Sequence, residues 1–144
     1  SGQNDFGKEA IATLIKEMED NRDKLVVILA GYTDDMEELL VTNPGFKSRI
    51  SNYIEFEDYT PEELFEIFVY NCKNEQFTYE PEVESYVKEW LHHRYEHRDK
   101  NFGNAREVRR LIEQMKLRLA NRVQAYDIQG DNRRCFVLED VKEI

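Results

Sequence analysis

The chain has 144 residues, of which 20 are basic and 30 are acidic, and its net charge is −10. This balance disfavours broad electrostatic binding to nucleic-acid backbones, although a local basic cluster can still bind a single phosphate. Because no apolar run approaches the roughly 20 residues of a membrane span and no apolar signal segment opens the chain, we expect a cytoplasmic protein without a membrane partner.

The first predicted element is an amphipathic helix over residues 6–19, where apolar side chains recur at helical spacing. Its start overlaps the pattern G-x-x-x-x-G-K at positions 2–8, which opens a phosphate-binding loop. A working loop also needs a preceding strand and a Ser or Thr after the lysine, whereas here one residue precedes Gly2 and position 9 is Glu. We therefore expect Lys8 to be an exposed helix residue and not a phosphate ligand.

A strand–helix–strand unit is predicted next. Residues 25–32 (LVVILAGY) are apolar on both faces at their centre, which is typical of a buried strand in a parallel sheet. A short helix begins near position 33 and ends at Asn43-Pro44-Gly45, and residues 53–57 alternate as an edge strand does. A buried strand needs a neighbour on each side. We therefore expect part of a sheet whose other strands lie elsewhere.

From position 59 onward the pattern changes to helices. Thr60, Pro61 and Glu63 form a helix start with a capping box, and further helices are expected from Pro81 and from Asn104, where Glu107 has capping-box spacing. A polar loop follows over 127–134, and a short element closes the chain. We expect two domains, residues 1–58 and 59–144, the second a small all-α bundle.

Four segments taken together resemble a known family: LVVILAGYTDDM, NPGFKSRI, DYTPEELFEIF and FGNAREVRR. In this order and spacing they are similar to the AAA+ ATPases, in the branch that contains the red-type rubisco activase and the stage V sporulation protein K. The resemblance implies the C-terminal half of a P-loop-type α/β core followed by a helical lid. It also implies that the phosphate loop (Walker A) and the acidic strand end (Walker B) are absent from this chain.

The same resemblance implies function. An intact parent protein is expected to bind ATP and Mg²⁺ and to assemble as a hexameric ring. It is also expected to remodel a protein client in the manner of a chaperone. The chain alone is expected to hold no tightly bound nucleotide and not to hydrolyse ATP. The pathway, whether sporulation, carbon fixation or another, stays open, and so does the client.

Three positions match residues that act on the nucleotide in this family. Arg49 matches the arginine finger, which reaches the site of the next subunit and stabilises charge on the transferred phosphoryl group; the alternative is a surface arginine at the sheet rim. Arg106 matches the second sensor of the lid, in the first turn of its helix; the alternative is an arginine paired with acids of the lid. Thr33 occupies the first-sensor position, where Asn is common, and a simple helix cap is the alternative.

Other candidates receive simpler interpretations. His93 and His97 share a helix face at a spacing that can bind a metal, but no third ligand stands at a motif spacing, so we expect no metal site. Cys72 and Cys135 are expected to be free thiols. Lys47 is a neighbouring cation of the finger position.

A rival hypothesis is a non-catalytic protein-interaction module that keeps a lid-like fold without ATP chemistry. For either hypothesis, an isolated chain with an unpaired central strand is expected to form dimers or other oligomers that cover the exposed edge.

Overall fold

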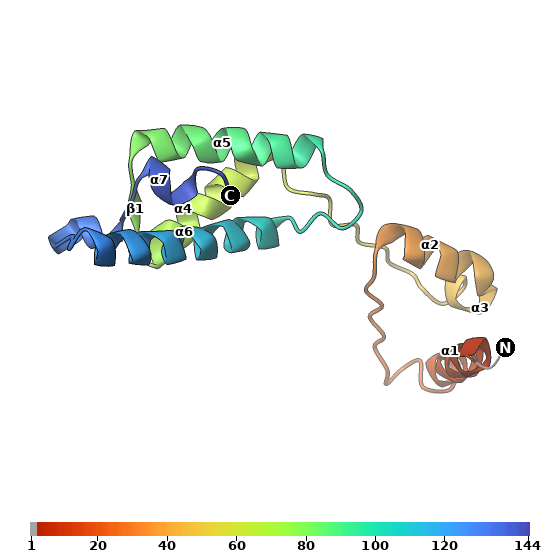
Figure 1. The fold of residues 1–144 in the computed structure, drawn as a ribbon. Helices are drawn as coiled ribbons and strands as arrows, with labels where there is room; N and C mark the ends of the chain where they lie inside the picture. Colours follow the sequence, from red (N-terminus) through yellow and green to blue (C-terminus); the bar gives the residue numbers. More distant parts are fainter. Residues whose placement is uncertain (1–2) are drawn as a thin grey trace. The chain divides into compact units, whose positions relative to one another are not determined.

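The computed structural model describes residues 3–144 and divides into two compact units, Ser1–Phe56 and Glu57–Ile144 (Figure 1). Gly2, the first glycine of the phosphate-loop pattern, lies outside the described residues. The other glycine of that pattern, Gly7, and Lys8 lie in a helix and are exposed. Lys8 is thus an exposed helix residue, as predicted.

The described part of unit 1 contains three helices, α1 (Gln3–Asp20), α2 (Thr33–Thr42) and α3 (Pro44–Lys47), and irregular segments. The helices predicted over 6–19 and from position 33 are confirmed. Phe46 of α3 is buried, and Gly45 lies so close to α1 that a side-chain carbon there would meet Ile15 Cδ1 at 3.0 Å. The glycine therefore allows α3 to approach α1.

The two strands predicted for unit 1 do not form, and those predictions are wrong. Residues 25–32 and 53–57 have no regular secondary structure in the described chain. Most of their apolar side chains are exposed, with Val26 and Ile28 at 85%, Ile54 at 78% and Phe56 at 90%, while Val27 and Leu29 are half-buried. A strand is stabilised by hydrogen bonds and side-chain pairs with neighbouring strands, so a strong strand pattern without a partner stays irregular.

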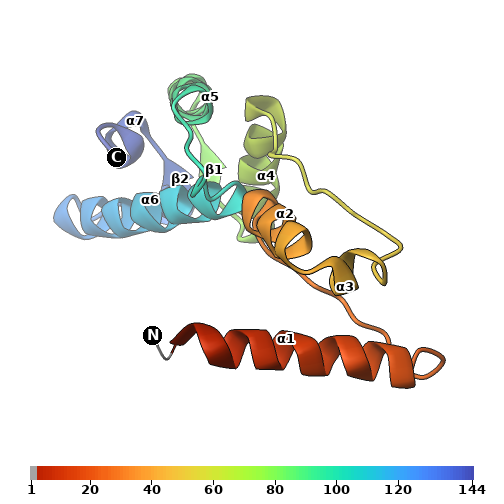
Figure 2. The same cartoon turned by 90° about the vertical axis from the view of Figure 1, so that its right-hand side faces the viewer.

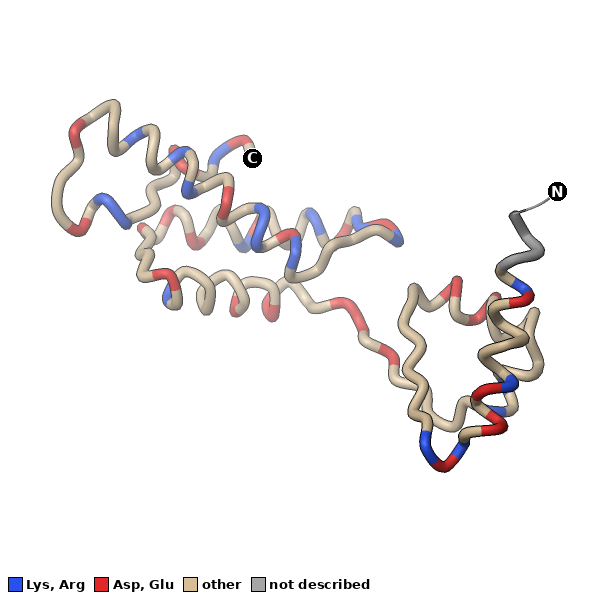
Figure 3. Tube along the Cα trace, turned by 90° about the horizontal axis from the view of Figure 1, so that it is seen from below, with Lys and Arg blue, Asp and Glu red and all other residues tan. Residues whose placement is uncertain are grey.

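Unit 2 is helical with one small sheet, in agreement with the predicted all-α lid (Figure 2). Its elements in chain order are α4 (Pro61–Asn74), β1 (Thr78–Tyr79), α5 (Pro81–Glu96), α6 (Ala105–Ala125), the 3₁₀ helix η1 (Gly130–Arg134), β2 (Cys135–Phe136) and α7 (Leu138–Val141). Strands β1 and β2 pair in parallel, with Thr78 opposite Cys135. Acidic and basic positions are interspersed along the helices (Figure 3).

Two helix starts, those of α4 and α5, agree with the start signals read from the sequence. The Thr60 hydroxyl accepts the Glu63 backbone N–H, and the Glu63 carboxylate accepts the Thr60 N–H, so the predicted capping box of α4 is confirmed. Pro81 opens α5 at its first position. In the part of the chain that the structure describes, none of the helices has both the length and the apolar character that a membrane crossing requires.

One core joins the helices of unit 2. It is formed by buried apolar side chains of α4, α5, α6, β2 and α7: Leu64, Phe68, Cys72, Val83, Val87, Leu91, Val108, Leu111, Ile112, Met115, Leu119, Phe136 and Val141. Burial of this kind is the main stabilising contribution to a small domain. The core fixes α6, and thereby the position of its first turn.

A buried ion pair closes the C-terminal end of unit 2. Asp140 of α7 is 1% exposed, and its carboxylate accepts Arg122 Nε at 3.0 Å and Nη2 at 2.9 Å. The same carboxylate accepts the Val137 N–H, and Arg122 Nη2 also donates to the Cys135 carbonyl. The hydrogen bonds that Arg122 donates to Asp140 raise the pKa of Arg122, so the charged pair is the stable form.

Candidate functional site

The first turn of α6 presents an unpaired cation. Arg106 is the second residue of this helix and is exposed. Its guanidinium makes no hydrogen bond or ion pair to any side chain in the part of the chain that the structure describes. Backbone N–H groups without helical partners and the positive end of the helix dipole lie in the same turn. An anion is therefore favoured at this position on two grounds, the side-chain charge and the helix end.

Glu107, the acidic residue next to Arg106 in the sequence, is already paired with other arginines. Glu107 is 8% exposed, and its carboxylate accepts Arg94 Nη2 at 2.7 Å and lies 3.7 Å from Arg110 Nη1. A side-chain carbon at Gly103 would meet Glu107 Oε1 at 2.8 Å, so glycine makes room for this carboxylate. Because Arg94 and Arg110 neutralise Glu107, Arg106 is left free, and its alternative interpretation as a paired lid arginine is wrong for the described chain.

The predicted capping box at Asn104 and Glu107 is wrong. Asn104 is the N-cap residue of α6, but its side chain makes no capping hydrogen bond. It binds instead to Asp58 and to the Tyr59 backbone, 46 and 45 positions earlier, while Glu107 turns to Arg94. Tertiary partners therefore replace the local capping bonds that the spacing predicted.

Arg49 is held on the surface of unit 1. Its Nη2 lies 2.8 Å from Glu19 Oε2 of α1, its Nε donates to the same oxygen at 3.1 Å, and its Nη1 donates to the Gly45 carbonyl at 3.1 Å. The two side chains are 29% and 58% exposed, respectively. An ion pair this exposed contributes only about 0–1 kcal/mol, so a stronger anion can displace Glu19 from the arginine.

Thr33 and Lys47 complete the predicted set. Thr33 is the first residue of α2 and is exposed; the N-cap is Tyr32, so the alternative that Thr33 caps the helix is wrong. Lys47 is exposed at the end of α3. Arg49 and Lys47 lie in unit 1 and Arg106 in unit 2.

No metal centre emerges among the described residues. In that part of the chain the structure has no cluster of three potential His, Cys, Asp or Glu ligands. The His93 and His97 rings stack with centroids 4.2 Å apart, and His97 Nδ1 lies 2.9 Å from the His93 carbonyl. Cys72 and Cys135 are free thiols, and burial raises the pKa of Cys72 to about 12.

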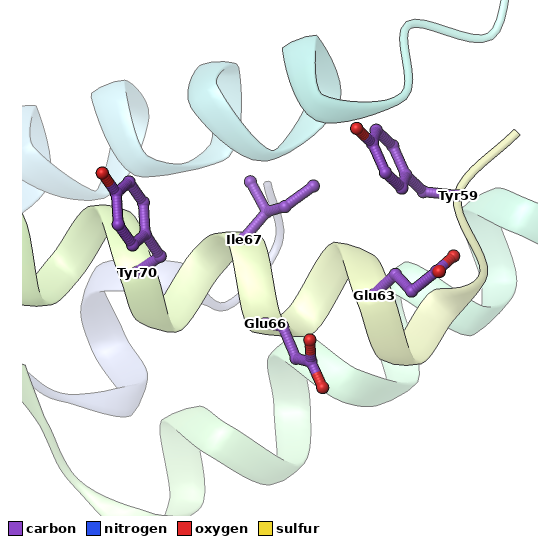
Figure 4. A pocket seen from close by; sticks show the side chains of 5 residues that line it. All are labelled: Tyr59, Glu63, Glu66, Ile67 and Tyr70. Carbon is purple, nitrogen blue, oxygen red and sulfur yellow. The ribbon is translucent and has the colours of Figure 1, made fainter. Parts of the chain in front are cut away.

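A shallow, open depression lies along α4. It is lined by Tyr59, Glu63, Glu66, Ile67 and Tyr70, with Tyr59, Ile67 and Tyr70 on the same side of the helix (Figure 4). None of the three predicted site residues lines it. The cationic position at α6 and this depression are therefore formed by different residues, although Tyr59 of the depression is hydrogen-bonded to Asn104 at the start of α6.

Comparison with known proteins supports the family suggested by the motifs. The family model described as "AAA lid domain" matches residues 60–144, which is more than half of the chain. The chain belongs to the AAA lid domain family. This match covers almost all of unit 2, including Asn104 and Arg106, and leaves Arg49 and Thr33 outside it.

Related proteins extend the similarity into unit 1. The chain is 45% identical to Protein CbbX of Cereibacter sphaeroides over 121 residues, 84% of this chain and 38% of that protein. It is 42% identical to the chloroplastic ribulose bisphosphate carboxylase/oxygenase activase of Cyanidioschyzon merolae over 85% of this chain and 41% of that protein, and 42% identical to Protein CfxQ of Xanthobacter flavus. The chain thus spans about two fifths of the length of these relatives. It matches the C-terminal AAA+ part of CbbX-type proteins with its lid, and the relation to stage V sporulation protein K stays a prediction.

Two arrangements at the site were not predicted from the sequence. The pairing of Arg94 with Glu107 and the binding of Asn104 to Asp58 join residues 13 and 46 positions apart. A partial signal was present, because Glu107 stands directly before Val108, the first of the helically spaced apolar residues that face the core, where an unpaired acid is costly. The sequence did not indicate which cation neutralises it.

Proposed function

We propose that this chain is the C-terminal part of an AAA+ ATPase subunit that couples ATP binding and hydrolysis to the remodelling of a protein client. In this proposal Arg106 senses the nucleotide of its own subunit, and Arg49 acts as the arginine finger on the nucleotide of the next subunit. Thr33 occupies the first-sensor position. The remaining nucleotide contacts come from segments outside this chain, so the chain alone does not hydrolyse ATP.

The observation that carries the proposal is the unpaired, exposed Arg106 in the first turn of α6. Neighbouring Arg94, Arg98 and Arg110 each have an acidic partner, whereas Arg106 does not within the described residues. A guanidinium presents several donors in a planar fork that matches phosphate oxygens. Arg109 also has no ion pair in the described chain, but Arg106 lies in the first turn of α6, beside the free N–H groups, which is the arrangement expected for binding a phosphate group.

The exposed ion pair between Arg49 and Glu19 is compatible with the role of an arginine finger. The surrounding contacts hold the guanidinium in one place, yet the exposed pair with Glu19 is easily exchanged for a phosphate. Phosphoryl transfer spreads negative charge over the γ-phosphate oxygens, and an arginine that enters the site contributes about 10³–10⁵ in rate. Mg²⁺ would stabilise charge on the phosphates in the intact enzyme; we assign no residue of this chain to it.

ATP hydrolysis by the complete protein that contains this chain tests the proposal. Arg106→Ala is expected to lower turnover strongly, and Arg109→Ala is a matched control because Arg109 is also exposed on α6 without an ion pair in the described chain. Arg49→Ala is expected to lower kcat by about 10³-fold or more, with exposed Arg22 as its control. Equal activity in the site variants and their controls would exclude these roles.

The rival hypothesis of a non-catalytic interaction module has a clear signature in the same experiment. It predicts no Mg²⁺-dependent ATP turnover by the complete protein before any substitution is made. Rings are expected from the proposal, so light scattering of the complete protein with and without ATP gives an independent measurement of self-association.

A further inference from the structure

One short side chain attaches the segment before α4 to the start of α6. Asn104 Nδ2 donates to Asp58 Oδ1 at 2.7 Å, and Asn104 Oδ1 accepts the Tyr59 backbone N–H at 2.9 Å. The amide thus uses its donor and its acceptor on two consecutive residues. These residues precede Thr60, the cap of α4, and follow Phe56, the last residue of unit 1.

A second cation completes this arrangement. Arg98 Nε donates to the other carboxylate oxygen of Asp58 at 3.1 Å, and Arg98 Nη1 donates to the Tyr95 carbonyl at 2.8 Å. The Arg98 guanidinium also lies 3.8 Å from the centre of the Tyr95 ring. Each oxygen of Asp58 therefore has a different partner. We call Asp58, Tyr59, Arg98 and Asn104 the clasp.

The backbone of Asn104 shows that its position is imposed by these partners. Its φ is 49° and its ψ is −126°, a combination that residues with a side chain rarely adopt. Such a conformation persists only where the surrounding contacts determine it. Because the side chain does not cap α6, the clasp contacts are the ones that fix it.

We propose that Asn104 is a positioning residue that couples Arg106 to the linker, the segment of residues 57–59 before α4, through Asp58 and the Tyr59 amide. This inference rests on the nucleotide role proposed for Arg106. Arg106 lies two positions after Asn104, so a phosphate that binds at the first turn of α6 acts on the same backbone that holds the linker. Displacement of this turn changes the two clasp hydrogen bonds, and the linker responds to the state of the anion site.

The variant Asn104→Gly separates the side chain from the backbone. Glycine adopts positive φ without steric cost, so the start of α6 keeps its geometry while both clasp hydrogen bonds from residue 104 are lost. In the full chain, exchange of the Tyr59 amide with water, measured by NMR, is expected to become on the order of tenfold faster. Asn101→Gly is the control, because Asn101 is exposed and its side chain makes no hydrogen bond to the described chain. Unchanged Tyr59 exchange in Asn104→Gly would refute the clasp.

Coupling is measured in the same chain by titration with tripolyphosphate at low ionic strength. Shifts are expected at the amides of residues 105–107 and at Tyr59 in the unsubstituted chain, and at 105–107 alone in Asn104→Gly. Asp58→Ala is a second variant with the same expected result. A Tyr59 response that is equal with and without Asn104 overturns the coupling while the role of Arg106 stands. Absence of any shift at 105–107, or shifts that persist in Arg106→Ala, overturns the anion site and the coupling with it.

Discussion

Loss of the Asp140 carboxylate should destabilise unit 2 more than any other single acidic substitution in it. In Asp140→Ala the guanidinium of Arg122, whose side chain is 13% exposed, stays buried without a counter-charge, and the Val137 N–H loses its acceptor. Removing one partner of a buried ion pair costs about 3–5 kcal/mol. For a domain of this size, that corresponds to a fall in Tm of at least about 10 °C.

Denaturant unfolding of the full chain measures this loss. The single tryptophan, Trp90, donates to the Ile144 carbonyl at 3.2 Å, so its fluorescence follows unit 2. Glu139→Ala is the matched control on the same helix, because Glu139 is exposed, and it should change stability by less than about 0.5 kcal/mol. The double variant Arg122→Met/Asp140→Leu should recover much of the loss, since it removes both charges. A loss below about 1 kcal/mol in Asp140→Ala would refute the reasoning.

Three further predictions concern the core and the helix starts of unit 2. Thr60→Ala should cost about 1 kcal/mol of unfolding free energy in urea titrations, whereas Thr60→Ser should retain the capping bond and most of the stability. Since burial raises the pKa of Cys72 from 9.0 to about 12, the folded chain keeps a proton that the unfolded chain releases, so the contribution of Cys72 to stability should fall as pH rises above about 9. Near neutral pH a thiol reagent should modify Cys135 before Cys72, and equal rates would contradict this account of burial. Gly103→Ala should displace the Glu107 carboxylate and cost about 1 kcal/mol or more, and an unchanged urea midpoint would show that the carboxylate moves freely.

The helices were predictable because their signals are local. The capping box of Thr60 and Glu63 and the proline at position 81 both act within one turn, and the structure places helix starts at both. The absence of the two strands was not predictable in this way. An alternating or apolar pattern indicates which faces of a strand are buried when partner strands are present, but it does not show that those partners exist. With no partner strand in the described chain, Val26 and Ile28 are exposed.

The candidate site was predictable in part for the same reason. The position of Arg106 in the first turn of α6 follows from local sequence, and its lack of an acidic partner does not. The missing acidic partner of Arg106 depends on Arg94 of α5, which forms an ion pair with the neighbouring Glu107. Likewise, Asn is a favourable N-cap residue, but the Asn104 side chain forms hydrogen bonds with Asp58 and the Tyr59 N–H and does not cap α6.

The proposal that Arg49 and Arg106 act on the nucleotides of different subunits is tested most directly by mixing the Arg49→Ala and Arg106→Ala variants of the complete protein that contains this chain. In a ring, Arg49→Ala subunits supply an intact Arg106, and Arg106→Ala subunits supply an intact Arg49. A random equal mixture then restores both groups at about a quarter of the subunit interfaces, because each interface joins two different faces. The account predicts ATP hydrolysis well above the mean of the two variants alone. A mixture whose activity equals that mean would contradict it.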